Sequence, residues 1–486
     1  METKIEKRDW LFLLVCLLLG VLGEEAFFRD RIGISYLVFI IGFYAIFFWR
    51  FRGFNFSHQR LGYFILCCIW ILAANFFLYD NMVFYSLNLL ALPVLVIFHI
   101  VLITSPKNIN WSKPVFIFYL FSKLLDSIKF NFSFAKGSGK FFKEGADEKK
   151  YQVWKKVIVG VAISIPVLFI VLNLLMSADS QFERIIGNFP QWFDVMSSEN
   201  IFRCIVVLIY TFAFFGLMQV LIQRKIQVID PQNNNQFIKF DDIIALTVLV
   251  LINSVYLLFV LVQFKYFFSG TLQGDYTYAQ YARRGFFELL FVTMINLSIT
   301  VFVISFVKST GKNVKRIMKI ILSILILSSV IILSSAFMRM LMYEEAYGFT
   351  FTRVLVHSFM IFLLIIIAYT LVRIWLERIS LFHFYFIAGL LYYTCINIIN
   401  IDQIVVNENI GRYEQTGKID IHYLNSLSYT GVLSLIDLYE KDLKINGLSE
   451  TLKERQASGN SEKTPWQSYN LTRDHALKEL RDLRIQ

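Results

Sequence analysis

Charged residues and cysteine are both scarce in this chain of 486 residues. Lysine, arginine, aspartate and glutamate make up 17% of it, whereas hydrophobic residues make up 57%. None of the cysteines has the spacing of metal ligands, two are adjacent, and all lie in apolar stretches. The sequence therefore predicts small buried side chains rather than disulfides or a zinc site. The five cysteines are Cys16, Cys67, Cys68, Cys204 and Cys395.

Motifs that carry cofactor or catalytic chemistry are also missing from the sequence. The six histidines are scattered, with none at the i, i+4 spacing of a helical metal site. The string "GSGK" at 137–140 lacks the earlier glycine and the Ser or Thr of a phosphate-binding loop, and no G-x-S-x-G motif occurs. We therefore predict no metal, no cofactor and no catalytic residue, so that an enzyme is the less favoured class.

Long apolar runs stand in place of these motifs. Stretches such as "VFYSLNLLALPVLVIFHIVLI" carry almost no charge and are apolar on all sides. About 20 such residues let a helix cross a ~30 Å hydrocarbon layer, where the backbone must satisfy its own hydrogen bonds. We predict an all-α, polytopic transmembrane helical bundle with about eleven spans. They are 10–22, 34–49, 63–79, 83–104, 157–176, 201–221, 243–264, 285–306, 317–338, 354–372 and 382–401.

Lysine and arginine are distributed unevenly between the loops, and basic residues near membrane ends stay in the cytoplasm. With the N-terminus inside, the inside loops hold 27 basic residues and the outside loops hold 8. The same arrangement places the residues after 401 on the outside. We therefore predict a multi-pass protein of the cytoplasmic membrane with an extracytoplasmic C-terminus.

The longest predicted loop, 105–156, is also the most basic, with eleven lysines. Within it, residues 111–130, "WSKPVFIFYLFSKLLDSIKF", combine apolar runs with lysines, as a helix lying along a membrane surface does. Each basic residue near a membrane surface attracts anionic headgroups by roughly 1 kcal/mol. We expect anionic lipid headgroups as the partner at the cytoplasmic face. The net charge of +11 has no nucleic-acid-binding motif beside it.

Two helix boundaries at the predicted outer face carry arginine, glutamate and tyrosine. In "DYTYAQYARRGFFELLFVTMIN", residues 275–296, a capping box of Thr277 and Gln280 starts a helix that enters an apolar span. In "AFMRMLMYEEAYGFTFTR", residues 336–353, Gly348 is expected to end one helix, and Thr350 or Thr352 to cap the next.

A third segment follows the last span. The helix there is expected to continue without a break from the bilayer to Thr416 and to stop at Gly417. Together the three segments predict a polar layer on one membrane face, since the middle of the bilayer has almost no ionisable group. The candidate ligand-binding or polar-layer residues are Tyr281, Arg283, Arg284, Glu288, Arg339, Tyr343, Glu344, Glu345, Tyr347, Arg353, His357, Asn400, Asp402, Arg412 and Tyr413.

Residues 402–486 are mostly polar and are predicted to form a helical soluble tail. Helical apolar spacing recurs in 420–428, 430–445 and 448–457, with Asp420 as one N-cap, and Thr472 is expected to cap the final helix. The predicted regions are therefore 1–104, N-terminal transmembrane helices; 105–156, the basic loop with its interfacial helix; 157–401, a transmembrane bundle; and 402–486, the tail.

Four strings carry a resemblance: "YTYAQYARRGFFEL", "RMLMYEEAYGFT" with its following arginine, "NIGRYEQTGKIDIHYL" and "WQSYNLTRDHALKEL". They resemble a bacterial family of multi-pass membrane proteins known as a domain of unknown function (the 4173 type, related to the 4153 type). The likeness covers roughly residues 200–486. It implies a bacterial membrane location and no activity, and Gln280 stands where similar sequences usually carry glutamate. Its most characteristic positions here are Tyr281, Arg283, Arg284, Glu288, Arg339, Glu344, Glu345, Tyr347, Arg353 and Arg412.

Three function classes remain open from the sequence. The first is a protein whose outer arginine-rich layer binds or transports an anionic ligand, a lipid headgroup or a peptide, since guanidinium groups match carboxylate and phosphate geometry. The second is a signalling or regulatory scaffold in which the outer tail is the sensor. The third is an envelope enzyme acting on a lipid-linked substrate at the outer face. A purely structural lattice of salt bridges competes with all three as the reason for the polar layer.

Overall fold

The computed structural model describes residues 7–141, 157, 160, 164, 171, 175, 198–223, 240–269, 286–307, 311–441, 445–460 and 465–485. Within these residues the chain forms sixteen α-helices and one 3-10 helix, and the single extended pairing is an isolated bridge between Phe240 and Val307. The helices are α1 (Lys7–Phe27), α2 (Ile34–Arg50), α3 (Gln59–Leu78), α4 (Met82–Thr104), α5 (Pro114–Phe141), α8 (Ser198–Ile222), α9 (Asp242–Ser269), α11 (Phe286–Phe306), α12 (Lys312–Tyr347), α13 (Phe351–Trp375), α14 (Leu381–Ile398), α15 (Ile401–Thr416), α16 (Ile421–Ser426), α17 (Tyr429–Lys441), α18 (Leu448–Asn460) and α19 (Leu471–Asp482), with η3 at Trp466–Ser468.

Nine helices of the described residues are long and apolar enough to cross a membrane, which confirms the all-α, multi-pass fold. They are α1, α3, α4, α8, α9, α11, α12, α13 and α14. The span predicted at 34–49 is α2, whose 17 residues are fewer than the usual crossing needs. The span predicted at 157–176 lies almost entirely outside the described residues. The count of eleven and the orientation therefore stay predictions.

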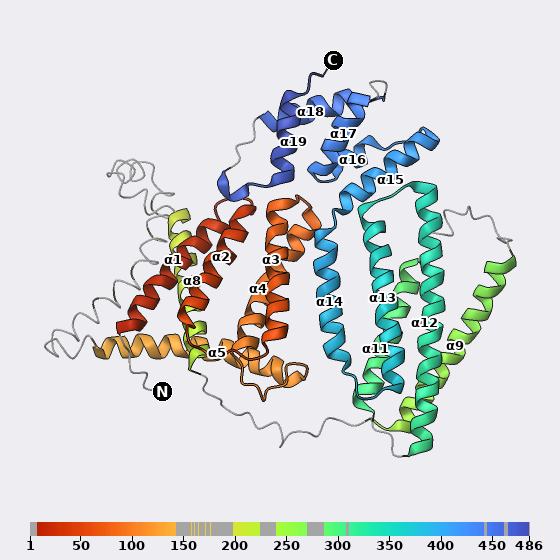
Figure 1. Cartoon of the computed structure of the whole chain (residues 1–486), viewed down its shortest axis with the longest axis horizontal. Coiled ribbons are helices and arrows are strands. Elements are labelled where there is room, and N and C mark those ends of the chain that lie inside the picture. The colour runs from red at the N-terminus through yellow and green to blue at the C-terminus, as the bar shows by residue number, and fades with distance from the viewer. Residues whose placement is uncertain are drawn as a thin grey trace. The chain divides into compact units, whose positions relative to one another are not determined.

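The chain divides into two compact units that alternate along the sequence. Unit 1 comprises residues 1–77, 91–226 and 464–469, and unit 2 comprises 78–90, 227–463 and 470–486. The helices of both units are labelled in Figure 1. The described helices of unit 1 are α1, α2, α3, α5, α8 and the second half of α4, and those of unit 2 begin with the first half of α4 and continue from α9 to α19.

Unit 1 is held together by close packing of α1 on α8. A Cβ added at Gly20 of α1 would lie 2.6 Å from Thr211 Oγ1 and 2.7 Å from the carbonyl oxygen of Val207, both on α8. Small residues at such crossings let helix backbones approach closely. The ring of Phe12 meets that of Phe215 nearby, with centroids 5.9 Å apart. This pair of helices forms the surface against which α5 packs.

The segment around η3 completes unit 1 from the far end of the chain. Gly33 N–H donates to the carbonyl of Gln467 at 2.8 Å, and Ile34 N–H donates to the carbonyl of Tyr469 at 3.0 Å. The Gln467 amide also donates to Glu25 Oε1 at 2.6 Å. A Cβ at Gly33 would lie 2.4 Å from the Tyr469 carbonyl oxygen, so this pairing requires glycine there.

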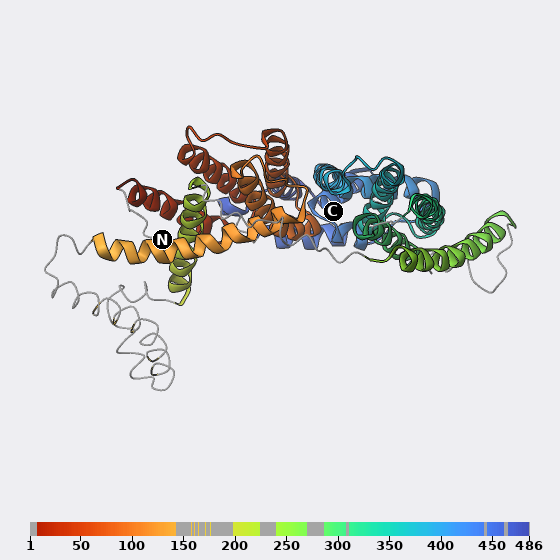
Figure 2. The ribbon, with the colours of Figure 1, turned by 90° about the horizontal axis from the view of Figure 1, so that it is seen from below.

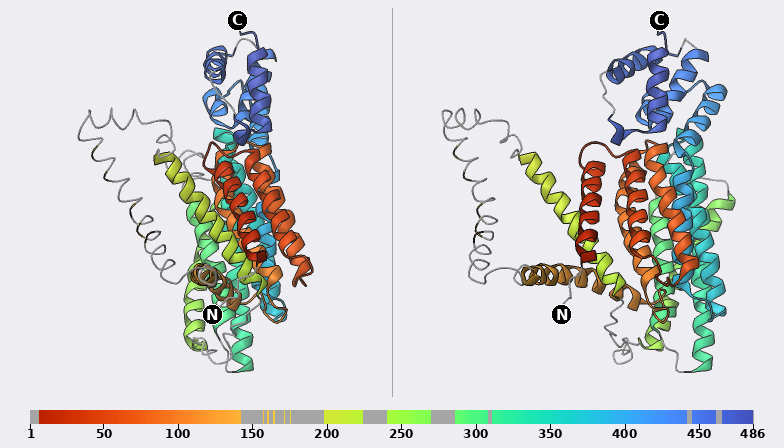
Figure 3. Two further views of the ribbon diagram at one scale, coloured as in Figure 1. Left: turned by 90° about the vertical axis from the view of Figure 1, so that its left-hand side faces the viewer. Right: turned by 60° about the vertical axis from the view of Figure 1, so that its left-hand side comes forward.

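Unit 2 has its core between α9, α11, α12 and α13, where Leu249, Leu325 and Ile326 are fully buried. A buried hydrogen bond joins α11 to α12, with Asn296 Nδ2 donating to Ser329 Oγ at 3.0 Å. Figure 3 shows the helices α15–α19 gathered at one end of α12–α14. The predicted tail is therefore a small helical layer at that end of unit 2.

The tail helices enclose a second core of their own. Leu424, Leu435, Leu452 and Leu480 come from four different helices and are all buried together. The predicted segments 420–428, 430–445 and 448–457 correspond to α16, α17 and α18. The predicted cap at Asp420 is confirmed, because its side chain accepts from Tyr423 N–H at 2.9 Å.

Two predictions about helix ends in this region are wrong. The last span does not continue to Thr416, because α14 ends at Ile398 and Asn400 caps a separate helix by accepting from Gln403 N–H at 3.2 Å. The new helix, α15, ends at Gly417, with φ of 67°, as predicted. The final helix is capped by Asn470 rather than by Thr472, whose hydroxyl donates to the carbonyl of Leu78 at 2.6 Å.

Candidate functional site

The turn between α12 and α13 organises the candidate site in unit 2. Gly348 ends α12 with φ of 81° and ψ of 179°, a backbone conformation essentially restricted to glycine. Thr350 then caps α13 by accepting from Arg353 N–H at 3.4 Å. The sequence predicted Gly348 as the end of α12 and left Thr350 and Thr352 as alternative caps of α13, of which Thr350 is the one observed. Because only three residues separate the helices, the last turn of α12 faces the first two turns of α13.

A buried carboxylate–imidazole pair lies just inside this turn. Glu344 of α12 is 2% exposed, and its Oε2 is 3.1 Å from Nδ1 of His357 on α13. The ring of Phe337 packs on the imidazole with centroids 4.6 Å apart. The remaining polar atoms of the pair, Glu344 Oε1 and His357 Nε2, are buried without a hydrogen-bond partner among the described residues. This pair therefore depends strongly on its single contact.

Arg353 occupies the outermost turn of α13, four residues before His357. Its guanidinium carbon lies 4.1 Å from the ring centroid of Tyr343, and its Nη1 donates to the carbonyl of Gly348. Among the described residues, no carboxylate forms an ion pair with this half-buried guanidinium. The Tyr343 ring and the backbone carbonyl therefore hold the guanidinium group in one orientation. Its other N–H groups can donate hydrogen bonds to an anion.

The other predicted residues of α12 divide between the interior and the surface. Arg339 is 8% exposed and lies one helical turn before Tyr343. Glu345 and Tyr347 are exposed, and the Tyr347 ring lies 5.0 Å from that of Tyr343. Arg339, Tyr343 and Glu344 therefore belong to the packed side of the helix, and Glu345 does not.

Asn409 of α15 joins the tail to the α12–α13 turn by hydrogen bonds. The Asn409 side chain accepts from Phe349 N–H at 3.2 Å and donates to the carbonyl of Phe349 at 2.8 Å. A Cβ at Gly348 would lie 2.8 Å from Asn409 Oδ1 and 3.0 Å from Arg412 Nη1, which places Arg412 at the same turn. The hydroxyl of Tyr423 accepts from Phe351 N–H at 2.8 Å. Burial, as the largest cause, raises the pKa of Tyr423 and so keeps its hydroxyl neutral.

Asp402 anchors the start of α15 to neighbouring segments. Its side chain is 3% exposed, and Oδ2 accepts from Asn81 Nδ2 at 3.0 Å and from Ser428 Oγ at 2.5 Å. Asn400 beside it donates to Thr430 Oγ1 at 3.3 Å. Asp402 also lies in the first turn of α15, where the helix dipole favours a carboxylate. These contacts give Asp402 and Asn400 a structural role.

The remaining predicted residues are described only in part. Tyr281, Arg283 and Arg284 lie outside the described residues, and so do Thr277 and Gln280 of the predicted capping box. Glu288 is in the first turn of α11 with an exposed side chain. Tyr413 is half-buried on α15.

A family model matches this chain from residue 66 to residue 438, more than half of its length, and its description is "Domain of unknown function (DUF4153)". The chain belongs to this family. The match is to the 4153 type and not to the resembled 4173 type, and it begins well before residue 200. No curated protein and no solved structure is significantly similar to the chain. The chain is thus a multi-pass membrane protein of the DUF4153 family, and the description of that family names no activity.

The DUF4153 match also contains buried polar residues that the sequence analysis missed. Tyr393 donates to Asn88 Oδ1 at 2.6 Å, Asn88 Nδ2 donates to Asn397 Oδ1 at 2.8 Å, and Asn397 Nδ2 donates to the Tyr393 carbonyl at 2.8 Å. Asn88 and Asn397 are 0% and 1% exposed. Asparagine inside an apolar run was the available signal, since a membrane-buried amide needs a partner.

The part of the DUF4153 chain that the structure describes contains neither a metal site nor a paired cysteine. No group of three or more His, Cys, Asp or Glu side chains there could hold a metal ion. All five cysteines are free, but the prediction that all are buried is wrong, because Cys67, Cys204 and Cys395 are exposed. In a membrane bundle an exposed apolar side chain faces lipid, so an apolar run does not reveal which of its side chains are packed.

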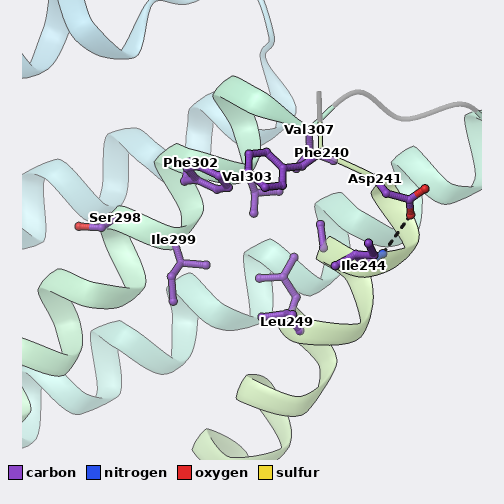
Figure 4. A pocket seen from close by; sticks show the side chains of 11 residues that line it. Phe240, Asp241, Ile244, Leu249, Ser298, Ile299, Phe302, Val303 and Val307 are labelled. Atoms are coloured by element: carbon purple, nitrogen blue, oxygen red, sulfur yellow. Dashed lines mark hydrogen bonds between the residues drawn. The ribbon is translucent and has the colours of Figure 1, made fainter. Parts of the chain in front are cut away.

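An apolar cavity of about 470 Å³ lies between α9 and α11 in the DUF4153 region (Figure 4). Ile244, Val248, Ile299 and Phe302 contribute to its wall, and Asp241 lies at its margin, where it caps α9 by accepting from Ile243 and Ile244 N–H groups. Its other polar lining residue, Ser298, donates its hydroxyl to the carbonyl of Met294 at 2.8 Å, so the wall is almost wholly apolar and offers little to orient a polar ligand. The cavity therefore does not extend the arginine site.

A charged cluster marks the opposite end of α12 and α13. Glu377 Oε1 lies 2.7 Å from Lys315 Nζ and 2.8 Å from Lys319 Nζ. Hydrogen bonds from Lys315 first, and then Lys319, lower the pKa of Glu377 from its ordinary value to about 2. A lowered folded-state pKa stabilises the fold above the unfolded-state pKa, and that contribution is lost as the pH falls.

We expect the Glu377→Gln variant to be less stable than the parent protein above about pH 4.5 and equally stable by about pH 2. The difference should stay below about 1 kcal/mol, because the carboxylate is largely exposed. Thermal unfolding of the full chain across this pH range measures it. Glu408→Gln, at an exposed position of α15, is the control and should show no such window. A difference that persists unchanged at pH 2 would exclude the ion cluster as its cause.

Proposed function

We propose that this protein binds an anionic group, such as the phosphate of a lipid headgroup, at the end of unit 2 formed by α12, α13 and α15. The single observation that carries the proposal is Arg353. Its guanidinium is half-buried, stacked on Tyr343 and hydrogen-bonded to the Gly348 carbonyl, and it has no ion pair with a described carboxylate. A guanidinium held in one orientation presents two parallel donors to phosphate or carboxylate.

The depth of Arg353 along its helix favours a membrane lipid over a solute. Arg353 is the third residue of α13, and the span of α13 covers Phe351–Trp375. The first turn of a span lies at the headgroup level, where tyrosine and arginine side chains gather. Arg412 adds a second guanidinium at Gly348. By the distribution of basic residues, this end faces the outside of a bacterial cytoplasmic membrane.

A test measures phospholipid bound to the full-length protein. We expect Arg353→Gln to weaken binding of phosphatidylglycerol by about 10- to 100-fold, since a hydrogen bond to a charged group contributes about 1.5–3 kcal/mol. Native mass spectrometry of protein extracted from nanodiscs of phosphatidylglycerol and phosphatidylcholine counts the retained lipid. Inorganic phosphate, assayed by thermal shift, separates a soluble anion from a headgroup as the ligand.

Two further variants complete this test. Arg353→Lys keeps the charge but loses the planar fork, so its affinity should fall between those of the parent and Arg353→Gln. Arg29→Gln removes an arginine that is already paired with Glu25 in unit 1 and should leave retention unchanged. Equal retention of phosphatidylglycerol and phosphate by all folded variants would refute the proposal.

A second candidate function is a signalling scaffold, and the Asn409 contact favours it. One side chain pairs with both the N–H and the carbonyl of Phe349, so movement of α15 is coupled to the α12–α13 turn. Arg353 donates to the adjacent Gly348 carbonyl. An anion bound at Arg353 would therefore act on the same turn.

A further inference from the structure

Helix α5 in unit 1 has one face that packs against protein. Phe134 and Phe130 lie 4.8 and 5.9 Å from the ring of Phe215 on α8, measured between centroids. Asn131 Nδ2 donates to the carbonyl of Phe212 at 2.8 Å. Ser127, one helical turn earlier, is buried and faces Gly216 of α8. The recurrence of these residues at three- and four-residue intervals defines a single side of the helix.

A second face of α5 is apolar and has no protein neighbour among the described residues. Phe118, Leu125 and Phe132 are 68%, 57% and 68% exposed. These large, exposed apolar side chains form a continuous row over four helical turns. Such a row marks an interaction surface, whereas single exposed apolar residues do not. The stripe, which we call the apolar stripe, consists of Ile117, Phe118, Phe121, Leu125, Ile128 and Phe132.

A third face of α5 is polar. Its residues recur at four, three, four and three positions, which places them on one side of a helix with 3.6 residues per turn. Lys129 and Lys136 on it are exposed. Lys129 Nζ lies 3.6 Å from Asp126, but its side chain is 76% exposed, so the contact leaves the ammonium in reach of other anions. This polar stripe consists of Ser122, Asp126, Lys129, Ser133 and Lys136.

The direction of α5 explains why one helix needs three faces. Figures 1 and 3 show it running across α1 and α8, and Figure 2 shows it crossing α8. Both α1 and α8 are candidate membrane spans, so a helix across them lies in the plane of the membrane. It packs on the side of α8 near Phe212 and Gly216, two to three turns before the helix ends at Ile222. Such a helix meets protein, acyl chains and headgroups at the same time.

We propose that α5 is an interfacial helix embedded in one membrane leaflet, with the apolar stripe among the acyl chains and Lys129 and Lys136 at the phosphates of anionic lipids. The occupant of the apolar face is thus the bilayer itself. Charge complementarity supports anionic lipid, because the charged groups of the polar stripe are two exposed lysines and one partly buried aspartate. This site is independent of Arg353, which belongs to unit 2.

Spin-label accessibility tests the orientation of α5 in the full-length protein. Single nitroxides are placed at Leu125→Cys, Ser133→Cys and Glu454→Cys in a background without native cysteine, in vesicles of phosphatidylglycerol and phosphatidylcholine. We expect the label at 125 to collide more often with oxygen, which dissolves in acyl chains, than with an aqueous nickel complex. The label at 454, exposed on α18, should show the reverse, and the label at 133 should be intermediate.

Two outcomes overturn the proposal. A label at 125 that meets the nickel complex as often as the label at 454 means that the apolar stripe faces water. A label at 125 that is shielded from both reagents means that another protein surface, such as a second copy, covers the stripe. Each variant is compared with the parent protein in elution volume and thermal unfolding, so that misfolded protein is excluded from the measurement.

The headgroup contact has a separate measurement. Native mass spectrometry should find phosphatidylglycerol binding lowered by about fivefold for each lysine removed in Lys129→Gln and Lys136→Gln. Lys441→Gln and Lys453→Gln, two exposed lysines of the tail, are the matched controls. Unchanged binding in the α5 variants would refute the anionic-lipid part of the proposal.

Discussion

Replacing Glu344 with alanine is expected to destabilise the full-length protein by about 1–3 kcal/mol, the usual cost of leaving a buried polar group without its hydrogen-bond partner. Glu344 is 2% exposed, and its contact with His357 Nδ1 is 3.1 Å long. Without the carboxylate, both nitrogens of the imidazole remain buried with no acceptor, and a cavity opens beside Phe337. Thermal unfolding of the protein in nanodiscs measures the loss.

The adjacent residue provides the matched control for this variant. Glu345 is exposed on the same turn of α12, so Glu345→Ala should change stability by less than about 0.5 kcal/mol. Glu344→Gln keeps the shape and one acceptor oxygen and should cost less than Glu344→Ala. If Glu344→Ala and Glu345→Ala unfold at the same temperature, the pair does not stabilise the fold.

Gly348→Ala is expected to be the most damaging single-methyl addition at the α12–α13 turn. The conformation at Gly348, with φ of 81° and ψ of 179°, costs other residues about 1–3 kcal/mol. The new methyl would also lie 2.8 Å from Asn409 Oδ1, so the two bonds from Asn409 to Phe349 would be weakened, at about 1 kcal/mol each. Hydrogen exchange of α15, together with limited proteolysis of the tail, reports the loss.

The matched control for Gly348 lies in α15 itself. Gly411 is helical, and a Cβ there meets nothing within 4 Å. Gly411→Ala should therefore stabilise the protein by about 0.5–1 kcal/mol. Should Gly348→Ala leave the protection of α15 unchanged, then the turn does not hold the tail, and the scaffold function loses its support.

Features governed by local chemistry could be predicted from the sequence. Gly348 and Gly417 end helices because glycine alone adopts positive φ without strain, and Asp420 starts a helix because its side-chain oxygen accepts from the N–H three residues later. The apolar runs likewise fixed the membrane class, since no other use of such runs satisfies the backbone. These rules need no knowledge of the partner surfaces.

Choices between neighbouring candidates for one role could not be predicted. Asn470 and Thr472 are both acceptable N-caps, and the packing of Thr472 against the Leu78 carbonyl decides between them. The apolar pattern predicts a continuous helix through Asn400, but the Asn400 side chain starts a new helix and donates to Thr430 of α17. A tertiary contact decides the first case, and a local bond between side chain and backbone decides the second.

Long-range pairs in the site were out of reach for a different reason. Asn409 and Phe349 are 60 residues apart, and the side-chain amide of Asn409 pairs with the backbone of Phe349. No sequence pattern indicates a pairing with a backbone group. The pairing of Asn88 with Asn397 spans 309 residues. Glu344 and His357 were both candidates, but nothing in their spacing showed that they would meet across two helices. The charge pattern thus named candidate residues without identifying which of them would pair.

The alternation of the two units along the chain limits how the protein can be taken apart. Residues 78–90 belong to unit 2 although unit 1 flanks them on both sides in sequence, and residues 464–469 belong to unit 1 although unit 2 flanks them. No single cleavage of the polypeptide yields two fragments that each hold a whole unit. During synthesis, unit 1 therefore stays incomplete until its last segment, which carries Gln467 and Tyr469, has left the ribosome.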